Sequence, residues 1–410
     1  MSIVVQKFGG TSVKNLECQR QVMNKVLRPL REGHKMVVVL SAMSGETNRL
    51  LCLAKEWAPN PDPAELDSLV STGEQVSIAL FSMLLNQQGI RARSLLGFQI
   101  PVLTDNDHTR ARILDIDAKT LKGYFEDHDV LVVAGFQGVD CNGRITTLGR
   151  GGSDTSAVAL AAALQADVCE IYTDVCGVFT TDPNICADAR KLERVSYDEM
   201  LEMASMGAKV LQIRSVEFAK KYNVNVHVRS TFSDEPGTIV TQEDENMEAV
   251  LVSGIAYDKD QARVTLVHVH DKPGVSAALF APLAEKGILV DMIVQNPSKD
   301  GRTDMTFTVP RAELDMTVKV LESLQLEIGF EKLFSDKNVS KVSIVGVGMR
   351  NHSGVASSAF KALAAENINI HMISTSEIKI SCLIEDKYTE LAVRTLHKTF
   401  NLDKVAGQTC

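Results

Sequence analysis

Apolar and polar positions alternate in blocks over the first 230 residues of the chain. Short apolar runs with strand-like composition lie at 3–8, 36–40, 92–96, 130–134, 144–148 and 169–173. Longer stretches with helical periodicity lie between or after them, at 13–31, 64–88, 153–164 and 207–222. This alternation of strand and helix predicts an α/β domain, residues 1–233, built on a doubly wound, mainly parallel sheet.

The pattern changes after residue 233. Residues 233–248 are acidic, polar and rich in turn formers, so we expect a linker and lead-in strand over 234–262. Beyond the linker the chain repeats itself. The signature Gly274-Val275, Phe280, Leu283-Ala284, Ile288 recurs eighty positions later as Gly354-Val355, Phe360, Leu363-Ala364, Ile368. Each copy reads as a βαββ unit, so we expect two small α+β domains, 263–335 and 336–410, packed side by side around a small-ligand site.

Two glycine turns stand between a strand and a helix in the first domain. One is Gly149-Arg150-Gly151-Gly152-Ser153-Asp154-Thr155, and the other is Lys7-Phe8-Gly9-Gly10-Thr11-Ser12. Such turns direct unpaired backbone N–H groups and the positive end of a helix dipole at one point, which favours an anion. A P-loop requires a Gly-Lys dipeptide, and the chain has none. Phosphate would therefore be held by separate glycine turns and lysines.

Two further features belong to the same edge of the expected sheet. The hydroxyl-rich loop 41–48 follows the strand 36–40, and ligands of open α/β sheets gather at the carboxyl ends of strands. Glu74 follows a glycine, Gly73, inside the expected helix 64–88. A glycine is costly there unless another segment must approach closely, which makes Glu74 a candidate site residue.

Composition limits the classes of function. The chain has 410 residues, a net charge of −9 and no cluster of Lys and Arg, so a nucleic-acid partner is not expected. Its longest apolar run is far shorter than a membrane span and it begins without a secretory h-region, so we expect a cytoplasmic protein. Eight scattered cysteines without a CxxC pair predict reduced thiols and no metal site.

These motifs, in this order, resemble the aspartokinase family. The resemblance rests on the KFGGTS and GRGGSDT motifs, the 41–48 loop, Glu74, Thr173-Asp174 and Thr180-Thr181-Asp182-Pro183, and the tandem βαββ units resemble paired ACT domains. It implies the amino-acid kinase fold, a three-layer αβα sandwich, with two ferredoxin-like ACT domains. It also implies that ATP phosphorylates the side chain of L-aspartate to give 4-phospho-L-aspartate, the first step toward lysine, threonine and methionine, with Mg²⁺ as the counter-ion of ATP.

The resemblance also assigns roles to residues. Lys7 would stabilise the transferring phosphoryl group, which Gly9 and Gly10 would bind through backbone N–H groups, and Asp182 would orient Lys7 or the metal-bound phosphates. Arg150 would bind the α-carboxylate of aspartate and Glu74 its ammonium group. The pocket would be completed by Ser41, Thr47, Gly151, Ser153 and Asp154. The nucleotide would be held by Phe8, Thr173, Asp174, Phe179, Asp182 and Lys209. No general base is needed, because an aspartate side chain is already ionised at neutral pH.

In the C-terminal half the resemblance implies feedback regulation by lysine, threonine or both. The effector site would be formed by Asp271, Gly274, Val275, Ser276, Gln295 and Asn296. It further implies a homodimer or larger homo-oligomer formed through the ACT domains, and leaves open a shorter subunit that begins at Met247. Three residues depart from the family pattern: Cys176, Phe179 and Asn184 stand where Asp, Tyr and Arg are common. These three differences put the affinity for the nucleotide in question.

Two alternatives remain open at this point. One is another kinase of the same fold that acts on glutamate, acetylglutamate or a nucleotide; the pair Glu74 and Arg150 favours a free amino acid. The other is a catalytically silent amino-acid sensor, against which the presence of Lys7, Arg150 and Asp182 speaks. The chain ends at Cys410 with no dinucleotide-binding module, so a fused dehydrogenase is not expected.

Overall fold

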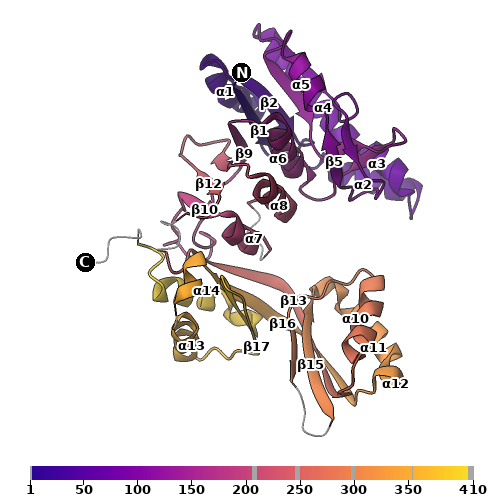
Figure 1. Cartoon of the computed structure of the whole chain (residues 1–410), viewed down its shortest axis with the longest axis vertical. Helices are drawn as coiled ribbons and strands as arrows, with labels where there is room; N and C mark the ends of the chain where they lie inside the picture. The colour runs from indigo at the N-terminus through magenta and orange to yellow at the C-terminus, as the bar shows by residue number, and fades with distance from the viewer. Residues whose placement is uncertain (1, 206–209, 245–249, 297–300, 353, 405–410) are drawn as a thin grey trace. The chain divides into compact units, whose positions relative to one another are not determined.

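The computed structural model describes residues 2–205, 210–244, 250–296, 301–352 and 354–404. They form two compact units (Figure 1). Among the described residues, the first unit contains 2–179, 191–205 and 210–244, and the second contains 180–190 and the remainder from 250 onward. The domain limits expected from the sequence stay predictions. Because residues 180–190 belong to the second unit, Asp182 is grouped with the C-terminal repeats.

The first unit is built on an eight-stranded sheet in the order β10-β12-β11-β9-β1-β2-β6-β3. Only the β11–β12 pair is antiparallel. The strands are β1 (Ile3–Phe8), β2 (Lys35–Leu40), β3 (Ala92–Leu95), β6 (Val130–Ala134), β9 (Val168–Thr173), β10 (Arg194–Ser196), β11 (Val226–Ser230) and β12 (Thr238–Thr241). Central strands β2 and β6 are apolar at nearly every position because helices cover both faces of the sheet.

Helices flank this sheet on two sides (Figure 1). Apolar side chains of α1 (Leu16–Arg31) and α4 (Thr72–Gln87) pack in one core cluster with those of β1, β2, β6 and β9. On the other face α6 (Gly152–Leu164) contacts β1, β2 and β9, and α5 (Ala118–Tyr124) and α8 (Ile213–Tyr222) pack on α6. The other helices are α2 (Glu46–Trp57), α3 (Pro63–Val70) and α7 (Tyr197–Ser205). The three-layer α/β sandwich expected from the sequence is confirmed.

The unit also contains a small second sheet that the sequence pattern did not predict. Its order is β5-β4-β7-β8, with β4 (Val102–Thr104), β5 (Ile113–Ile116), β7 (Gln137–Val139) and β8 (Ile145–Thr147). The run at 144–148 was expected and forms β8, but β4, β5 and β7 have only three or four residues each and give no detectable periodicity. The last strand of this sheet, β8, ends two residues before the turn Gly149–Gly152.

Residues 64–88, expected as one helix, form α3 and α4 with Ser71 between them. Hydroxyl groups explain the break, because Ser71 Oγ donates to Ser68 O and Thr72 Oγ1 donates to Leu69 O, in competition with helical bonds. By length and hydropathy, 63–87 could span a membrane, although half of its most apolar window is buried inside the protein. The buried carboxyl group of Glu74 marks it as a core segment of this unit.

The second unit contains both copies of the repeat in one six-stranded sheet, in the order β14-β15-β13-β16-β18-β17. The strands are β13 (Gly254–His270), β14 (Ile293–Asn296), β15 (Arg302–Val309), β16 (Lys332–Val345), β17 (Met372–Thr375) and β18 (Lys379–Glu385). The α-helices are α10 (Val275–Glu285), α11 (Leu314–Ser323), α12 (Gln325–Ile328), α13 (Val355–Ala365) and α14 (Thr389–Thr399). Short 3₁₀ turns occur at Arg311–Glu313, Val347–Asn351 and Asp386–Tyr388.

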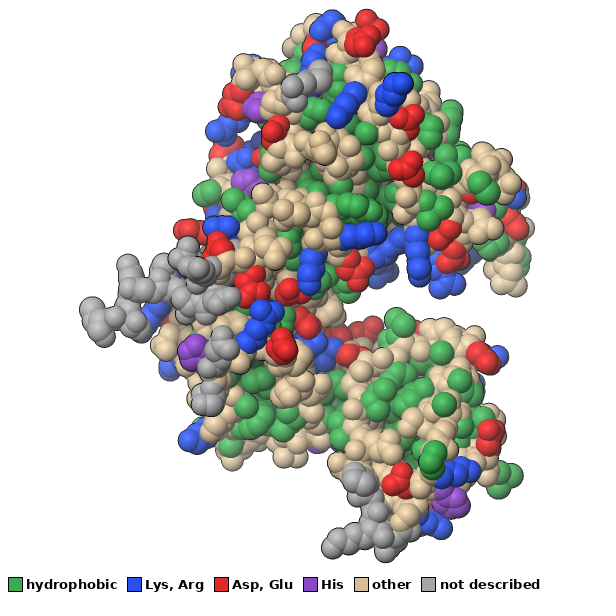
Figure 2. Space-filling model, viewed as in Figure 1, with side chains coloured by type: hydrophobic (Ala, Val, Ile, Leu, Met, Phe, Trp, Pro, Cys, Tyr) green, Lys and Arg blue, Asp and Glu red, His purple; other side chains and the backbone are tan. Residues whose placement is uncertain are grey.

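The two copies share more structure than a simple βαββ repeat requires. The strands expected at 264–270 and 342–347 are the ends of longer strands, because β13 and β16 pair with each other along nearly their whole length. Each copy also has a further helix after its third strand, α11 or α14, whose apolar side chains belong to the core of that copy. On the visible face of each unit, charged side chains of both signs are interspersed (Figure 2).

Candidate active site

A cavity of about 320 Å³ lies where the carboxyl ends of β1, β2 and β6 meet the start of α6. Five segments of the first unit supply its walls: the end of β1 and the turn after it, the loop after β2, the start of α4, Phe136 between β6 and β7, and the second glycine turn. The lining residues are Lys7, Gly10, Ser41, Ala42, Met43, Ser44, Gly45, Thr47, Glu74, Phe136, Gly149, Arg150, Gly151, Gly152, Ser153 and Asp154. The two glycine turns, about 140 positions apart in the sequence, therefore face one cavity.

Lys7 brings a positive charge to this cavity. It is the fifth residue of β1, and its Nζ lies 2.5 Å from Oδ1 of Asp154, in the first turn of α6. Both side chains are largely buried, with 12% and 9% exposed. Such a contact holds the ammonium group in one position, where it can stabilise charge on a transferring phosphoryl group.

Gly10 is required by a close backbone approach. A Cβ at this position would lie 2.7 Å from the carbonyl oxygen of Ala42, closer than two such atoms can come. The Gly10 carbonyl in turn accepts a hydrogen bond from Ser44 N at 3.2 Å. The first glycine turn and the 41–48 loop are therefore packed backbone to backbone, and this brings Ser41 and Thr47 to the cavity wall.

Glu74 is a buried carboxyl group with an unused oxygen. Glu74 is 3% exposed, and its Oε1 accepts a hydrogen bond from Ala42 N at 3.0 Å. Oε2 has no hydrogen-bond partner among the residues that the structure describes. Burial raises the pKa of Glu74 from 4.5 to about 7, and the Ala42 N–H opposes this shift. A cation entering the cavity would supply the missing partner.

Gly73, the glycine inside the helix, allows the close approach of another segment that the sequence predicted. A Cβ on Gly73 would lie 2.8 Å from the Cβ of Ala42, so α4 can approach the 41–48 loop only with glycine there. This approach allows the neighbouring Glu74 to reach Ala42 N.

The second glycine turn presents Arg150. Gly149 and Gly151 have φ values of 78° and 72°, a region that residues with a Cβ rarely adopt, and Gly151 caps α6. Arg150 lies between them with an exposed side chain that has no ionic or hydrogen-bond partner in the described part of the chain. The cavity therefore combines a free guanidinium group, a buried carboxyl group and a lysine, a set that suits a small molecule with both ammonium and carboxylate groups.

Comparisons with known proteins identify the family of the chain. Residues 2–230 match the amino acid kinase family, and residues 263–325 and 342–400 each match an ACT domain. The chain is 56% identical over 409 residues to an aspartate kinase of Pseudomonas putida, with 100% of each chain covered. The chain belongs to the aspartate kinase family. It is therefore a kinase that uses ATP to phosphorylate the side-chain carboxylate of aspartate, as expected from the sequence.

Two solved structures of E. coli aspartokinase III are similar to the chain over 97% of its length and 99% of theirs. One, described as a complex with aspartate and ADP in the R-state, is 27% identical with a TM-score of 0.79. The other, described as a complex with lysine and aspartate in the T-state, is 28% identical with a TM-score of 0.77. With the family known, neither a silent sensor nor a kinase for another substrate remains an alternative.

The structure does not group Asp182 with Lys7. Asp182 belongs to the second unit, where its Oδ2 accepts from the Tyr257 hydroxyl at 2.9 Å and its Oδ1 accepts from Asn184 N at 2.8 Å. Burial, reinforced by Asp182, raises the pKa of Tyr257 to about 12. The ion-pair partner of Lys7 is Asp154, which the sequence analysis placed only among substrate-binding residues. The predicted action of Asp182 on Lys7 stays a prediction.

The residues expected to hold the nucleotide lie outside the lining of the cavity, apart from Lys7 and Gly10. The Phe8 ring is fully buried and stacks on Tyr172 with ring centres 4.6 Å apart. Thr173 ends β9, and its hydroxyl donates to Asp174 Oδ1 at 3.0 Å. Phe179 is partly buried and forms an isolated antiparallel bridge with Lys191. Lys209 lies outside the described residues.

The expected effector residues come together in the first ACT repeat. Gly274 caps α10 with φ 93°, and Val275 packs in the apolar core. Ser276 Oγ lies 3.4 Å from Oε1 of Gln295, on the edge strand β14, which ends at Asn296. The N–H of Asp271 donates to the carbonyl of Gly301 at 2.9 Å. The turn before α10 and strand β14 thus form one surface.

Several residues at the site were missed by the sequence analysis. Within the 41–48 loop the sequence analysis named Ser41 and Thr47, but Met43, Ser44 and Gly45 also line the cavity, because the loop packs against the first glycine turn through its backbone. Phe136, between β6 and β7, was not named at all. Asp67, fully buried below the second glycine turn, was also missed. An aspartate inside an amphipathic helix reads as a solvent-exposed residue, so the sequence offered no signal for it.

Proposed function

We propose that the 320 Å³ cavity binds aspartate between Glu74 and Arg150. Glu74 would take the ammonium group through Oε2, the oxygen that lacks a partner among the described residues. Arg150 would take the α-carboxylate with two parallel hydrogen bonds, a geometry that lysine cannot supply. Ser41, Thr47, Gly151 and Ser153, all on the cavity wall, would complete the pocket. The observation that supports this most is that both charged groups line the same cavity.

The side-chain carboxylate of aspartate would then point toward Lys7. Phosphoryl transfer to a carboxylate brings two anions together, and catalysis depends on positioning and positive charge. The Lys7 ammonium group would offset this repulsion in the transition state, held in place by Asp154. Backbone N–H groups of Gly9 and Gly10 would bind the same phosphoryl oxygens.

For the nucleotide we propose Phe8, Thr173, Asp174, Phe179, Asp182 and Lys209, with Phe8 acting through its backbone because its ring is buried. Mg²⁺ would enter with ATP. The described residues contain no group of three or more side chains suited to hold a metal ion, which fits an ion bound mainly by phosphate oxygens. Asp154 is the carboxylate on the cavity wall that could contact it, and the ion would neutralise phosphate charge.

We further propose that lysine, threonine or both bind at the first ACT repeat. Asp271, Gly274, Val275, Ser276, Gln295 and Asn296 would form the site, and the lysine complex of E. coli aspartokinase III supports an amino-acid effector. Strands β14 and β17 are the two edges of the six-stranded sheet and have a strand partner on one side only among the described residues, which suits a homodimer or larger homo-oligomer formed through the ACT domains. Met247, the proposed start of a shorter subunit, lies outside the described residues.

The test is a hydroxamate assay with ATP and Mg²⁺, in which hydroxylamine traps the acyl phosphate. We expect product with aspartate and at most one hundredth of that rate with glutamate. Repeating the assay with lysine, threonine and their mixture identifies the effector. A protein that is inert with aspartate but active with glutamate would overturn the assignment of the pocket. Inhibition by neither amino acid would overturn the effector assignment alone.

A further inference from the structure

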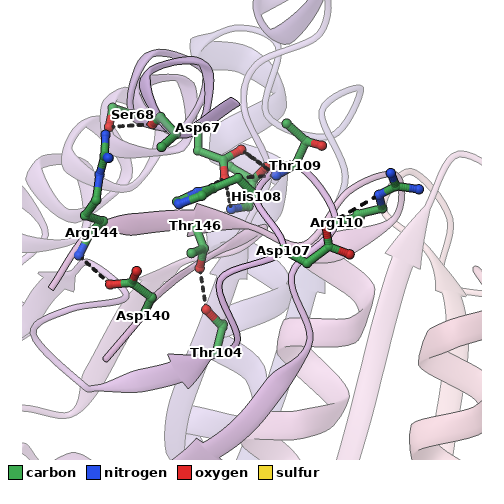
Figure 3. Close-up of polar contacts among 12 residues, drawn as sticks. Asp67, Ser68, Thr104, Asp107, His108, Thr109, Arg110, Asp140, Arg144 and Thr146 are labelled. Carbon is green, nitrogen blue, oxygen red and sulfur yellow. Dashed lines mark hydrogen bonds and ion pairs between the residues drawn. The ribbon is translucent and has the colours of Figure 1, made fainter. Parts of the chain in front are cut away.

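Asp67 is a fully buried carboxylate outside the lining of the active-site cavity, with an exposed fraction of 0%. It lies on α3 and accepts hydrogen bonds from four groups on two other segments; His108 and Thr109 of one segment are labelled beside it in Figure 3. Thr147 donates its N–H to Oδ2 at 3.0 Å and its hydroxyl to Oδ1 at 2.5 Å. Thr109 N lies 3.0 and 3.1 Å from the two oxygens, and His108 Nδ1 lies 2.9 Å from Oδ2. A buried charge needs this many donors to be stable.

The first segment held by Asp67 leads directly into the second glycine turn. Thr147 is the last residue of β8, two positions before Gly149 and three before Arg150. Arg214 supports the same stretch, since its guanidinium group donates to the carbonyls of Leu148 and Ala111 at 2.5 and 2.9 Å. The hydrogen bonds that Asp67 accepts therefore fix the position of Thr147. Because the second glycine turn starts two residues later, they also fix where Arg150 enters the cavity wall.

The second segment is the loop that contains His108 and Thr109, and it packs against the second glycine turn. A Cβ on Gly149 would lie 3.0 Å from the carbonyl oxygen of Thr109, so loop and turn are in close contact. Thr109 has φ 71°, a strained conformation for a β-branched residue. The bond from its N–H to Asp67 holds it there, as Figure 3 shows.

Asp67 is also connected to the wall of the cavity that carries Glu74. Helix α3 ends at Val70, and α4 begins two residues later, with Glu74 in its first turn. Glu74 lies only seven positions after Asp67. The carbonyl of Ser71, between the two helices, accepts from Gln137 Nε2 at 3.2 Å, which ties this junction to β7. Asp67 thus links the helical segment of Glu74 to the turn of Arg150.

We propose that Asp67 is a positioning residue that fixes the separation between Glu74 and Arg150. The inference rests on the proposed function of these two residues, which bind the ammonium and α-carboxylate groups of aspartate. The two groups of the substrate are at a fixed distance, so a small displacement of the turn prevents both contacts from forming together. Asp67 touches neither substrate nor nucleotide, so its loss should affect recognition of aspartate more than that of ATP.

Adjacent residues of β8 offer a matched pair of variants. Thr147 and Thr146 are 1% and 0% exposed, and both use their hydroxyl groups in buried hydrogen bonds. Thr147 donates to Asp67, whereas Thr146 bonds to Thr104 Oγ1 at 2.6 Å (Figure 3). Thr147→Val and Thr146→Val therefore remove the same group from the same strand, and only the first weakens the Asp67 contact.

The experiment measures KM for aspartate and for ATP in both variants and in Asp67→Asn. We expect Thr147→Val to raise KM for aspartate 3- to 10-fold and Asp67→Asn more than 10-fold, with KM for ATP changed less than 2-fold. Thr146→Val should leave both constants within 2-fold of wild type. If Asp67→Asn does not fold, the comparison of Thr147→Val with Thr146→Val still tests the positioning role of Asp67.

A second measurement separates positioning from general loss of structure. In an Arg150→Ala background the turn no longer binds the carboxylate, so Thr147→Val should have less than a 2-fold further effect on KM for aspartate. Equal effects of Thr147→Val and Thr146→Val, or full additivity with Arg150→Ala, would overturn the positioning role. A wild-type enzyme that is inactive with aspartate would instead overturn the proposed function on which the inference rests.

Discussion

Replacing Glu74 by glutamine should make the stability of the protein depend on pH in a different way from wild type. Burial raises the pKa of Glu74 to about 7 in the folded protein, against 4.5 in the unfolded chain. Below pH 4.5 the carboxyl group is neutral in both states. Between pH 4.5 and about 7 the unfolded chain releases the proton while the folded protein retains it, so the free energy of unfolding falls as the pH rises.

The size of this effect follows from the shift. A rise from 4.5 to about 7 corresponds to about 3 kcal/mol of stability that is present at pH 4.5 and lost by pH 8. Glu74→Gln keeps an oxygen for Ala42 N and has no charge to bury. The difference in free energy of unfolding, variant minus wild type, should therefore grow by about 3 kcal/mol between pH 4.5 and pH 8. For a unit of this size that is about 6 to 12 °C in melting temperature.

The assay is thermal or urea unfolding of the full chain over this pH range without substrate. Ser77→Ala is a suitable control, because it lies on the same helix, is fully buried and has no ionisable group. Its difference from wild type should not change with pH. If the Glu74→Gln difference is also constant with pH, then Glu74 is ionised at no cost in the folded protein, and the reasoning about its burial is refuted.

Three further predictions concern the phosphoryl site, the first glycine turn and the effector site. Lys7→Ala should lower kcat at least 100-fold in the hydroxamate assay and change KM for aspartate less than 3-fold, because its charge acts in the transition state; a loss confined to KM would contradict this. Gly10→Ala places a methyl group against the Ala42 carbonyl and should lower kcat/KM at least 10-fold, whereas Gly123→Ala, in a helix with open space around it, should leave activity unchanged and raise the melting temperature slightly. Ser276→Ala should raise the effector concentration for half-inhibition at least 5-fold in inhibition curves without changing the uninhibited rate, and unchanged inhibition would remove Ser276 from the effector site.

The large elements of the fold were predictable because their patterns are long. The central strands β2 and β6 are near-continuous apolar runs, β1 begins with three apolar residues, and α1 carries its apolar face over sixteen residues. Glycine pairs at strand ends likewise marked the two turns that face the cavity. Of the second sheet only β8 was expected, at 144–148; β4, β5 and β7 were not, because their three or four residues give no usable periodicity.

The site itself was predictable only where a residue's chemistry differs from its surroundings. Glu74 beside Gly73 was such a case, since a glycine inside a helix indicated a close approach that the structure contains. Contacts between distant segments gave no such indication. The pairing of Lys7 with Asp154 and the burial of Asp67 depend on how α6 and α3 pack, which single-sequence patterns do not encode.

Binding of aspartate in the presence of a non-hydrolysable ATP analogue tests most directly whether this cavity recognises the substrate. Isothermal titration calorimetry on wild type, Glu74→Gln and Arg150→Ala measures it without turnover. We predict that each substitution raises the dissociation constant of aspartate at least 10-fold and leaves that of the ATP analogue within 2-fold. Aspartate binding of wild-type strength in both variants would contradict the account, because the amino acid would then be recognised elsewhere.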